Sequence, residues 1–272
     1  MVKFAKFYET HLAMAAHANF TVTSAMANIL KTEFRAAAPV LILHDRPADI
    51  YQPLTDRQRV AFLRRYPPLA EHFAAILEGR TRLIISSTSW TDDEDFGLFL
   101  DALCSYSVTA SSSQSQLPEL AVVITGKGPQ KELYLDKIRE LRRGDAINMV
   151  HIYTDWLSFE DYALLLGSAD LGVSLHTSSS GVDLPMKVVD MFGAALPVVG
   201  WSKFAAWPEL VTENVNGRGF GSSEEMANIL RELFDPGSQQ LQTLKKGAKV
   251  ESNHRWSAEW DPIAGKLFGL VT

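Results

Sequence analysis

The sequence predicts an α/β protein with a Rossmann-like, doubly wound parallel sheet. After Leu83, short and nearly continuous apolar runs alternate with segments of helical pattern. Apolar runs without alternating polar residues are typical of strands that are buried on both faces of a parallel sheet. The predicted strands are Arg82–Ser86, Leu120–Thr125, Met149–Tyr153, Asp170–Leu175 and Leu196–Val199. Helices between such strands require right-handed crossovers, which favour a doubly wound sheet.

Capping signals predict where three of the intervening helices begin. The segments Thr91–Glu94 and Ser222–Glu225 each have the pattern of a capping box. Ser158 with Asp161 forms a weaker version of this signal before a helix at Tyr162–Ser168. The acidic run 92–95 is then expected in the first turn of a helix, where the helix dipole favours carboxylates. We therefore do not interpret this run as a metal site.

The first 80 residues differ from the rest because they contain few strand signals. A strand that enters a helix is predicted over Asn19–Met26, a second strand over Val40–Leu43, and a further helix around Thr55–Leu63. Two strands are too few for a separate sheet domain. We therefore divide the chain into residues 1–80, the tail of a preceding domain with a linker, and residues 81–272, a complete domain.

A serine-rich tract, Ser105–Gln116, lies between a predicted helix and the next predicted strand. Its low complexity is typical of exposed, irregular segments. We therefore expect a mobile surface insertion there, to which no function is assigned.

The composition excludes several classes of protein. The 272 residues are 46% hydrophobic and carry a formal net charge of -6, which argues against a general nucleic-acid-binding protein. The single cysteine, Cys104, excludes an intramolecular disulfide and fits a reducing compartment. No apolar run approaches the roughly 18–20 residues needed to cross a bilayer, and the N-terminus lacks the apolar segment of a signal peptide. We therefore expect a soluble chain with no nucleic-acid partner.

The most informative stretch is Ser178–Asp190, which lies between two predicted strands. It supplies a loop of small residues followed by a helix start, which is the layout of a phosphate-binding site. Backbone N–H groups of the loop and the positive end of the helix dipole attract a diphosphate. Lys187 adds a positive charge, and Asp190, one turn later, can accept hydrogen bonds from ribose hydroxyls. Such a site suits a nucleotide sugar.

A purely structural explanation has to be weighed against this hypothesis, because strand–glycine–helix turns occur in nearly every α/β protein. Two features favour a ligand site. Pro185 fits the first turn of a helix, where its missing N–H costs nothing. His176, Asp183, Lys187 and Asp190 gather at one strand end, which is more ionisable groups than packing requires.

Four segments follow one another in an order that is typical of one family: Ser86–Thr91, Ile124–Pro129, Leu166–Val173 and His176–Gly193. On these segments the chain resembles the chitobiosyldiphosphodolichol beta-mannosyltransferases over most of its length, from residue 21 to about residue 260. Members of this family add the first mannose to the dolichol-linked oligosaccharide. They belong to the two-domain (GT-B) glycosyltransferases.

The resemblance implies that mannose is moved from GDP-mannose, in beta-1,4 linkage and with inversion, onto GlcNAc2-diphosphodolichol in N-glycan precursor synthesis. It also implies a place on the cytosolic face of the endoplasmic reticulum, with other mannosyltransferases of the pathway as candidate partners. Residues 1–80 correspond to the end of the acceptor domain with a linker, and residues 81–272 to the GDP-mannose-binding donor domain. The membrane anchor and most of the acceptor domain of family members have no counterpart. Because the catalytic base is expected from that missing part, no catalytic residue is predicted.

The predicted donor-binding residues follow from the motif and the resemblance, and they gather where the carboxyl ends of the strands face one crevice. They are Ser89, Gly126, Lys127, Gly128, Trp156, Leu157, His176, Ser179, Ser180, Gly181, Asp183, Leu184, Pro185, Met186, Lys187 and Asp190. Ser89 represents the loop Ser87–Trp90, which is a candidate contact for the sugar or the diphosphate. Hydrogen-bond donors around the diphosphate should be the largest catalytic contribution of this half. No cofactor and no metal ion is expected at the donor.

Several of these positions have a structural alternative. Gly126–Gly128 is either a loop beside the donor or only a sharp strand-to-helix turn. Trp156 with Leu157 either holds the purine or forms a packing lid. His176 either contacts the mannose or is a buried histidine bonded to the backbone.

The two aspartates of the motif are not equivalent. In related GT-B enzymes, two carboxylates separated by seven intervening residues serve the sugar and the ribose. Asp190 matches the second of these carboxylates, the one that serves the ribose, by its distance to Leu196. Asp183 lies one residue too close to Asp190 to match the first carboxylate, the one that serves the sugar. We therefore assign Asp190 to the ribose, whereas Asp183 either contacts the sugar or caps the following helix.

Two further functions stay open from the sequence. A truncated or degenerate module could bind the nucleotide sugar, or a partner enzyme, without transferring mannose. An α/β interaction domain without a ligand is the third alternative. A transfer assay on a lipid-linked chitobiose acceptor separates the first of these from an active enzyme.

Overall fold

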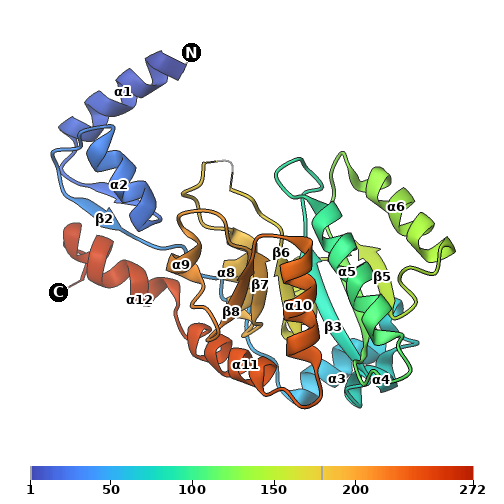
Figure 1. The fold of residues 1–272 in the computed structure, drawn as a ribbon. Coiled ribbons are helices and arrows are strands. Elements are labelled where there is room, and N and C mark those ends of the chain that lie inside the picture. The colour runs from blue at the N-terminus through green and yellow to red at the C-terminus, as the bar shows by residue number, and fades with distance from the viewer. Residues whose placement is uncertain (1, 179, 272) are drawn as a thin grey trace.

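The computed structural model describes residues 2–178 and 180–271 (Figure 1). Within these residues, a central parallel sheet has six strands in the spatial order β5-β4-β3-β6-β7-β8. The strands are β3 (Thr81–Ser87), β4 (Glu119–Thr125), β5 (Val150–Asp155), β6 (Leu171–Ser174), β7 (Val198–Trp201) and β8 (Gly217–Phe220). From β3 and from β6, successive strands move outward in opposite directions. The sheet is therefore doubly wound, and the predicted fold class is confirmed.

Helices cover both faces of the sheet and enclose two apolar cores (Figure 1). One core lies under α5 (Phe96–Ala110), α6 (Lys131–Arg143) and α10 (Ser223–Phe234). The other lies under α3 (Asp56–Arg65), η1 (Pro67–Leu69), α4 (Phe73–Leu77), α7 (Phe159–Ser168) and α8 (Met186–Gly193). The remaining C-terminal elements are α9 (Trp207–Leu210), α11 (Gln240–Glu251), α12 (Trp256–Trp260) and η2 (Asp261–Gly265).

Each of the five predicted strands of the sheet is present, within two residues of its predicted bounds. The sixth strand, β8, was not predicted. It contains Gly217, Arg218 and Gly219 before its one large apolar residue, Phe220, so it carries no apolar run. It lies at the edge of the sheet, where pairing with β7 alone holds it. An edge strand of this kind has no signal in the hydrophobic pattern.

Two of the three predicted helix starts are confirmed, and one is wrong. The hydroxyls of Ser158 and Ser222 accept hydrogen bonds from the first turns of α7 and α10, as predicted. The segment Thr91–Glu94, in contrast, does not open a helix, because α5 begins at Phe96 and Asp95 is its N-cap. Glu94 is not in a first helical turn either. Its side chain is only 2% exposed and is used inside the protein.

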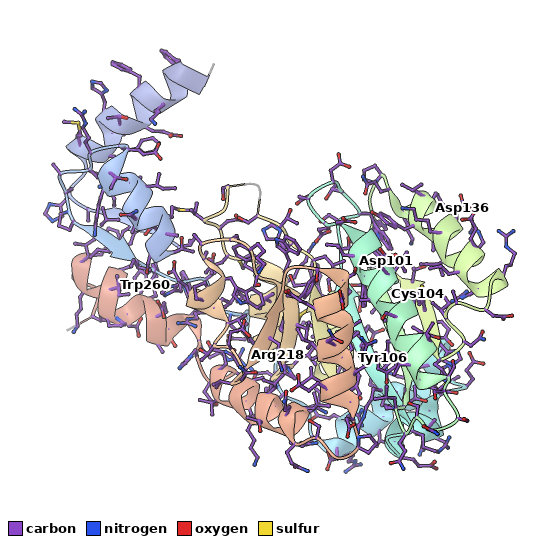
Figure 2. All side chains as sticks on the ribbon, viewed as in Figure 1. Asp101, Cys104, Tyr106, Asp136, Arg218 and Trp260 are labelled. Atoms are coloured by element: carbon purple, nitrogen blue, oxygen red, sulfur yellow. The ribbon has the colours of Figure 1, made fainter. Side chains whose placement is uncertain are left out.

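The prediction of a mobile surface insertion over Ser105–Gln116 is wrong for the first half of this tract. Residues 105–110 form the last part of α5, and the side chain of Tyr106 is fully buried (Figure 2). Its hydroxyl donates to the backbone oxygen of Pro118 at 2.8 Å. Leu103, Tyr106 and Ala110 recur at helical spacing and pack in one core. This burial outweighs the low helical propensity of the intervening serines.

The N-terminal part contains α1 (Val2–Ala15), β1 (Asn19–Thr21), α2 (Ser24–Thr32) and β2 (Val40–Ile42). The two strands pair in parallel as a separate small sheet, so both predicted strands are confirmed. No described helix is long and apolar enough to span a bilayer. Residues 51–77 behave differently, because Tyr51, Phe62 and Leu69 pack in the core under the main sheet. The division of the chain at residue 80 stays a prediction.

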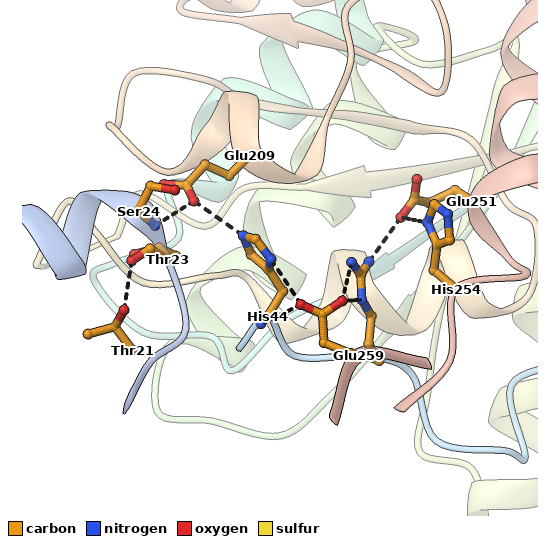
Figure 3. A network of polar contacts seen from close by, with 9 residues as sticks. Thr21, Thr23, Ser24, His44, Glu209, Glu251, His254 and Glu259 are labelled. Atoms are coloured by element: carbon orange, nitrogen blue, oxygen red, sulfur yellow. Dashed lines mark hydrogen bonds and ion pairs between the residues drawn. The ribbon is translucent and has the colours of Figure 1, made fainter. Parts of the chain in front are cut away.

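A polar network joins the N-terminal part to the C-terminal helices (Figure 3). Glu209 of α9 accepts hydrogen bonds from the backbone N–H of Ser24 at 2.6 Å and lies 3.3 Å from His44. Glu259 of α12 binds the other ring nitrogen of His44 and the guanidinium of Arg46, at 3.3 and 2.9 Å. These contacts hold the pKa of both carboxyls below its ordinary value, although burial acts against them. Ionisable side chains therefore link the N-terminal part to α9 and α12.

Candidate active site

A cavity of about 460 Å³ opens at the carboxyl ends of β3, β4 and β5, beside α8. Ser87, Thr125 and Asp155 are paired across these strands, so the three strand ends are level. This place adjoins the carboxyl ends of β3 and β6, the neighbouring strands at which the strand order reverses and α/β sheets bind their ligands. The lining residues are Tyr51, Ser87, Thr88, Thr125, Gly126, Trp156, Leu157, Ser158, Phe159, Tyr162, Lys187 and Asp190.

Asp190 is the acidic side chain of this cavity. Burial raises the pKa of its carboxyl to about 6. Its side chain is half-buried, and none of the residues that the structure describes donates a hydrogen bond to this carboxylate. Burial raises the pKa of Tyr51 to about 12, and the nearby Asp190 adds to the effect. A ligand with hydroxyl groups would supply the missing donors.

Lys187 is the basic side chain of the cavity, and it forms an ion pair with Glu94. The other oxygen of Glu94 accepts hydrogen bonds from the Thr88 hydroxyl and the Ser89 backbone N–H, both at 2.6 Å. The hydroxyl of Ser89 lies 3.4 Å from the Lys187 ammonium. Glu94 therefore ties the start of α8 to the loop after β3. No sequence pattern indicated this role, because the spacing of Thr91 and Glu94 is that of a helix cap.

The loop before α8 is closed by its own aspartate. The carboxylate of Asp183 accepts hydrogen bonds from the hydroxyls of Ser178 and Ser180 and from Nε2 of His176, the last at 2.8 Å. Burial acts to raise the pKa of Asp183, but these donors outweigh it and lower the pKa to about 2. The alternative role of Asp183 as a helix cap is wrong, because Pro185 is the N-cap residue and no side chain caps α8.

The other predicted residues of this loop differ in conformation and in exposure. Gly181 has a φ of 73°, a conformation that favours glycine, and an added Cβ would meet open space. Leu184 and Pro185 are buried, whereas Met186 is exposed at the start of α8. Ser179 lies outside the described residues. None of the described residues in 176–186 lines the cavity.

The glycines of the loop after β4 have a packing role. A Cβ on Gly126 would lie 1.8 Å from the backbone oxygen of Thr88, and one on Gly128 would lie 1.7 Å from that of Ser89. Both glycines therefore let this loop pack against the loop after β3. Gly126 also lines the cavity. At this residue the glycine therefore serves the packing of the turn and also lies beside the proposed donor site.

An aromatic residue covers one side of the cavity. Trp156 follows β5 directly, lines the cavity and is 60% exposed. The ammonium of Lys127 lies 4.3 Å from the centre of its ring, at a distance typical of a cation–π contact. Leu157 lines the cavity from a partly buried position against the core. The choice between a packing lid and a contact for the base stays open.

The structure thus brings five predicted residues to one cavity: Gly126, Trp156, Leu157, Lys187 and Asp190. Sequence reasoning missed several lining residues, namely Tyr51, Thr125, Ser158, Phe159 and Tyr162. Thr125 could have been found, because it ends a predicted strand. Tyr51 could not, because it belongs to a segment with no sheet signal that crosses under α7. The hydroxyls of Ser87 and Tyr162 lie 2.8 Å apart, and Thr125 donates to Ser87 at 3.2 Å, so three hydroxyls at the cavity are hydrogen-bonded to one another.

Comparison with known proteins agrees with this geometry. The family model described as "Glycosyl transferases group 1" matches residues 80–235. The chain is 52% identical over its full length to the chitobiosyldiphosphodolichol beta-mannosyltransferase of Arthroderma benhamiae, and it spans 61% of that protein. It is 38% identical over its full length to a protein of Arabidopsis thaliana named UDP-glycosyltransferase TURAN, of which it spans 66%. The predicted resemblance is therefore confirmed.

Solved structures agree on the fold. Anabaena Alr3699/HepE, crystallised in complex with UDP, superposes with a TM-score of 0.71 at 18% sequence identity. The superposition covers 99% of this chain and 68% of that protein. At this level of identity the likeness concerns the fold alone. With the family match over more than half of its length, the chain belongs to the group 1 glycosyl transferases.

Proposed function

We propose that this protein binds GDP-mannose in the cavity beside α8 and supplies the donor half of a beta-mannosyltransferase. One observation carries the proposal. Lys187 and Asp190 lie three residues apart on α8 and both line the same cavity. Residues at this spacing share a helix face. One helix turn therefore presents a positive charge for a diphosphate and a carboxylate for a ribose.

The two ends of the nucleotide sugar then have distinct surroundings. The ribose hydroxyls donate to Asp190, whose carboxylate has no donor among the described residues. The diphosphate lies toward Lys187 and the first turn of α8, where the helix dipole favours negative charge. Trp156 and Leu157 border the space left for the base.

In this proposal, Lys187 has a second role during transfer. The bond between the anomeric carbon and the diphosphate breaks, and negative charge develops on the leaving GDP. A fixed ammonium close to that charge stabilises the transition state more than the ground state. Glu94 holds the ammonium in place before the donor arrives. No metal ion is required in this scheme.

The acceptor part of the proposal rests on the relatives. Several are named chitobiosyldiphosphodolichol beta-mannosyltransferase, which favours a lipid-linked chitobiose as acceptor and the cytosolic face of the endoplasmic reticulum as location. A beta linkage from an alpha-linked donor requires inversion, and hence a base on the acceptor side. The chain spans about 60% of these relatives, and no catalytic base is assigned among its residues.

Calorimetric titration with GDP-mannose, GDP and UDP, each with and without EDTA, tests donor binding. We expect binding of the two guanine ligands and not of UDP, unchanged by EDTA. UDP is included because one relative is named a UDP-glycosyltransferase. Equal affinity for UDP would contradict the assignment of the base, and no binding at all would contradict the site. A transfer assay with lipid-linked chitobiose then separates an active enzyme from a binding module.

A further inference from the structure

Two histidines and a glutamate form a cluster at the end of the sheet that is opposite the cavity. Glu119 is the first residue of β4, His151 is the second residue of β5, and His72 directly precedes α4. Six residue steps of about 3.3 Å separate Glu119 from Thr125 at the cavity, so the cluster lies roughly 20 Å away. It is therefore separate from the proposed donor site.

The sheet register explains why these side chains meet. His151 is paired with Ala121, two positions after Glu119, and side chains two positions apart on a strand share a face. Ala121 lies in the core that also contains Ile76 of α4. Glu119 and His151 therefore face the layer of helices in which His72 lies. The rings of His72 and His151 are 4.3 Å apart between their centres.

The distances fit a metal ion. One ring nitrogen of each histidine and one carboxylate oxygen of Glu119 all lie within 4.8 Å of one another. Nε2 of His151 is 3.5 Å from Oε2 of Glu119. Two ligands of a tetrahedral zinc ion with bonds of about 2.1 Å are about 3.4 Å apart. Small side-chain rotations would therefore bring all three ligands to one ion.

His151 also has an unsatisfied atom at this place. Its Nε2 is buried, and within the described residues no hydrogen bond to it is found, although Glu119 is close. A buried polar atom without a partner destabilises a protein unless something else occupies it. A metal ion between His151 and Glu119 would satisfy both side chains.

The contacts of Tyr153 assign the tautomer of His72. The hydroxyl of Tyr153 donates its single proton to Glu71 at 2.6 Å, so it accepts the proton of Nε2 of His72 at 2.8 Å. Nδ1 of a neutral His72 is then unprotonated. Metal ligands must be unprotonated, and an outer hydrogen bond such as that of Tyr153 orients them.

We propose that His72, Glu119 and His151 form a binding site for a divalent transition-metal ion, with Zn²⁺ as the best match. Two imidazoles and one carboxylate are a donor set that suits zinc, with water at the fourth position. The ion would join the segment before α4 to β4 and β5. It would act as a structural link, independent of the donor cavity.

Calorimetry with ZnCl₂ on the untagged, EDTA-dialysed protein tests this inference. We expect one equivalent of zinc to bind, and both Glu119→Gln and His151→Gln to weaken binding at least about tenfold. His254→Gln is the matched control, since His254 is an exposed histidine 3.0 Å from Glu251 and outside the cluster. It should leave zinc binding unchanged. Zinc should also raise the melting temperature of the parent and of the control, but not that of the two cluster variants.

A second measurement identifies the ligands. Co²⁺ in place of Zn²⁺ should give the visible absorption of a four-coordinate ion in the parent and lose it in His151→Gln. Circular dichroism of each variant shows whether it is folded. If the parent takes up no zinc at micromolar concentrations, or if folded cluster variants bind it as tightly as the parent, the site does not exist.

Discussion

Asp183 and Asp190 lie on the two sides of Pro185, and the protein treats these two carboxyls in opposite ways. Asp183 closes the loop before α8 and accepts hydrogen bonds from three side chains, so its pKa falls to about 2. Asp190 lies inside α8 at the cavity, where burial raises its pKa to about 6. The carboxylate of Asp183 therefore has its hydrogen-bond donors within the motif, whereas the carboxylate of Asp190 has none among the described residues.

The difference separates a structural carboxylate from a binding one. The donors of Asp183 come from its own loop, and a ligand would have to compete with them. Asp190 is half-buried and has no donor among the described residues, which raises the free energy of its charged form. Such a cost is typical of functional sites, where the ligand supplies the missing partner. The predictions that follow test this contrast, beginning with the largest expected effect.

Lys187→Ala should affect both folding and binding. Removal of the ammonium leaves Glu94, which is 2% exposed, without its cationic partner, at a cost of about 3 kcal/mol in unfolding free energy. Affinity for GDP should fall by about 1.5–3 kcal/mol, as for a lost charge-assisted hydrogen bond. Urea denaturation and calorimetry measure the two effects.

The double variant Glu94→Gln, Lys187→Met separates these two effects. It removes both charges of the pair, so most of the lost stability should return, while GDP affinity stays low. If this variant binds GDP as well as the parent, Lys187 acts only as the partner of Glu94 and does not contact the diphosphate.

Asp190→Asn should weaken GDP binding by about 1–2 kcal/mol, because the amide accepts hydrogen bonds less strongly than a carboxylate. The parent should also bind GDP more tightly than 2′,3′-dideoxy-GDP, whereas Asp190→Asn should distinguish them less. Asp183→Asn is the matched control, and it should keep the full preference for GDP. A variant at 190 with undiminished preference would show that the ribose lies elsewhere.

The two aspartates should give opposite dependences of stability on pH. Asp190 keeps its proton in the folded state until about pH 6, whereas its ordinary pKa is 3.8, so its unfavourable contribution is absent below about pH 4 and complete above about pH 6. Asp190→Asn should therefore be more stable than the parent at pH 7, and this gain should vanish below pH 4. Urea denaturation from pH 3 to pH 8 measures it.

For Asp183 the sign is reversed. The folded-state pKa of about 2 lies below the ordinary value of 3.8, so the carboxylate stabilises the protein above about pH 4 and loses this effect between pH 4 and pH 2. Asp183→Asn should cost about 1 kcal/mol or less at pH 7, because solvent screens this loop. A loss that persists unchanged at pH 2 would point to packing instead of charge.

Trp156→Ala should have the smallest effect on stability, within about 0.5 kcal/mol, since the ring is 60% exposed. GDP affinity decides between the two explanations of this residue. A loss of about 1 kcal/mol would identify a contact for the base, as expected for an aromatic ring against a purine. An unchanged affinity would leave Trp156 as a lid held by Lys127.

Much of the sheet could be predicted from the sequence because its strands are buried on both faces, which leaves continuous apolar runs such as Leu120–Thr125. The edge strand at Gly217–Phe220 has no continuous apolar run, so it was not predicted. The prediction of a helix start at Thr91 was wrong because it rested on local spacing alone. Local spacing made Glu94 look like a cap, but the buried pairing with Lys187, far away in the chain, determines its position.

The sequence alone determined the fold class and the family, because these depend on the order of apolar runs and of motifs along the chain. Only the tertiary structure decided which polar groups share a space. Tyr51 reaches the cavity from the segment before α3, Glu94 pairs with Lys187 across the loops after β3 and β6, and His72 meets Glu119 and His151. Each of these meetings depends on packing between elements that are distant in the chain. Periodicity carries no information about such contacts, since it records only which face of an element is buried.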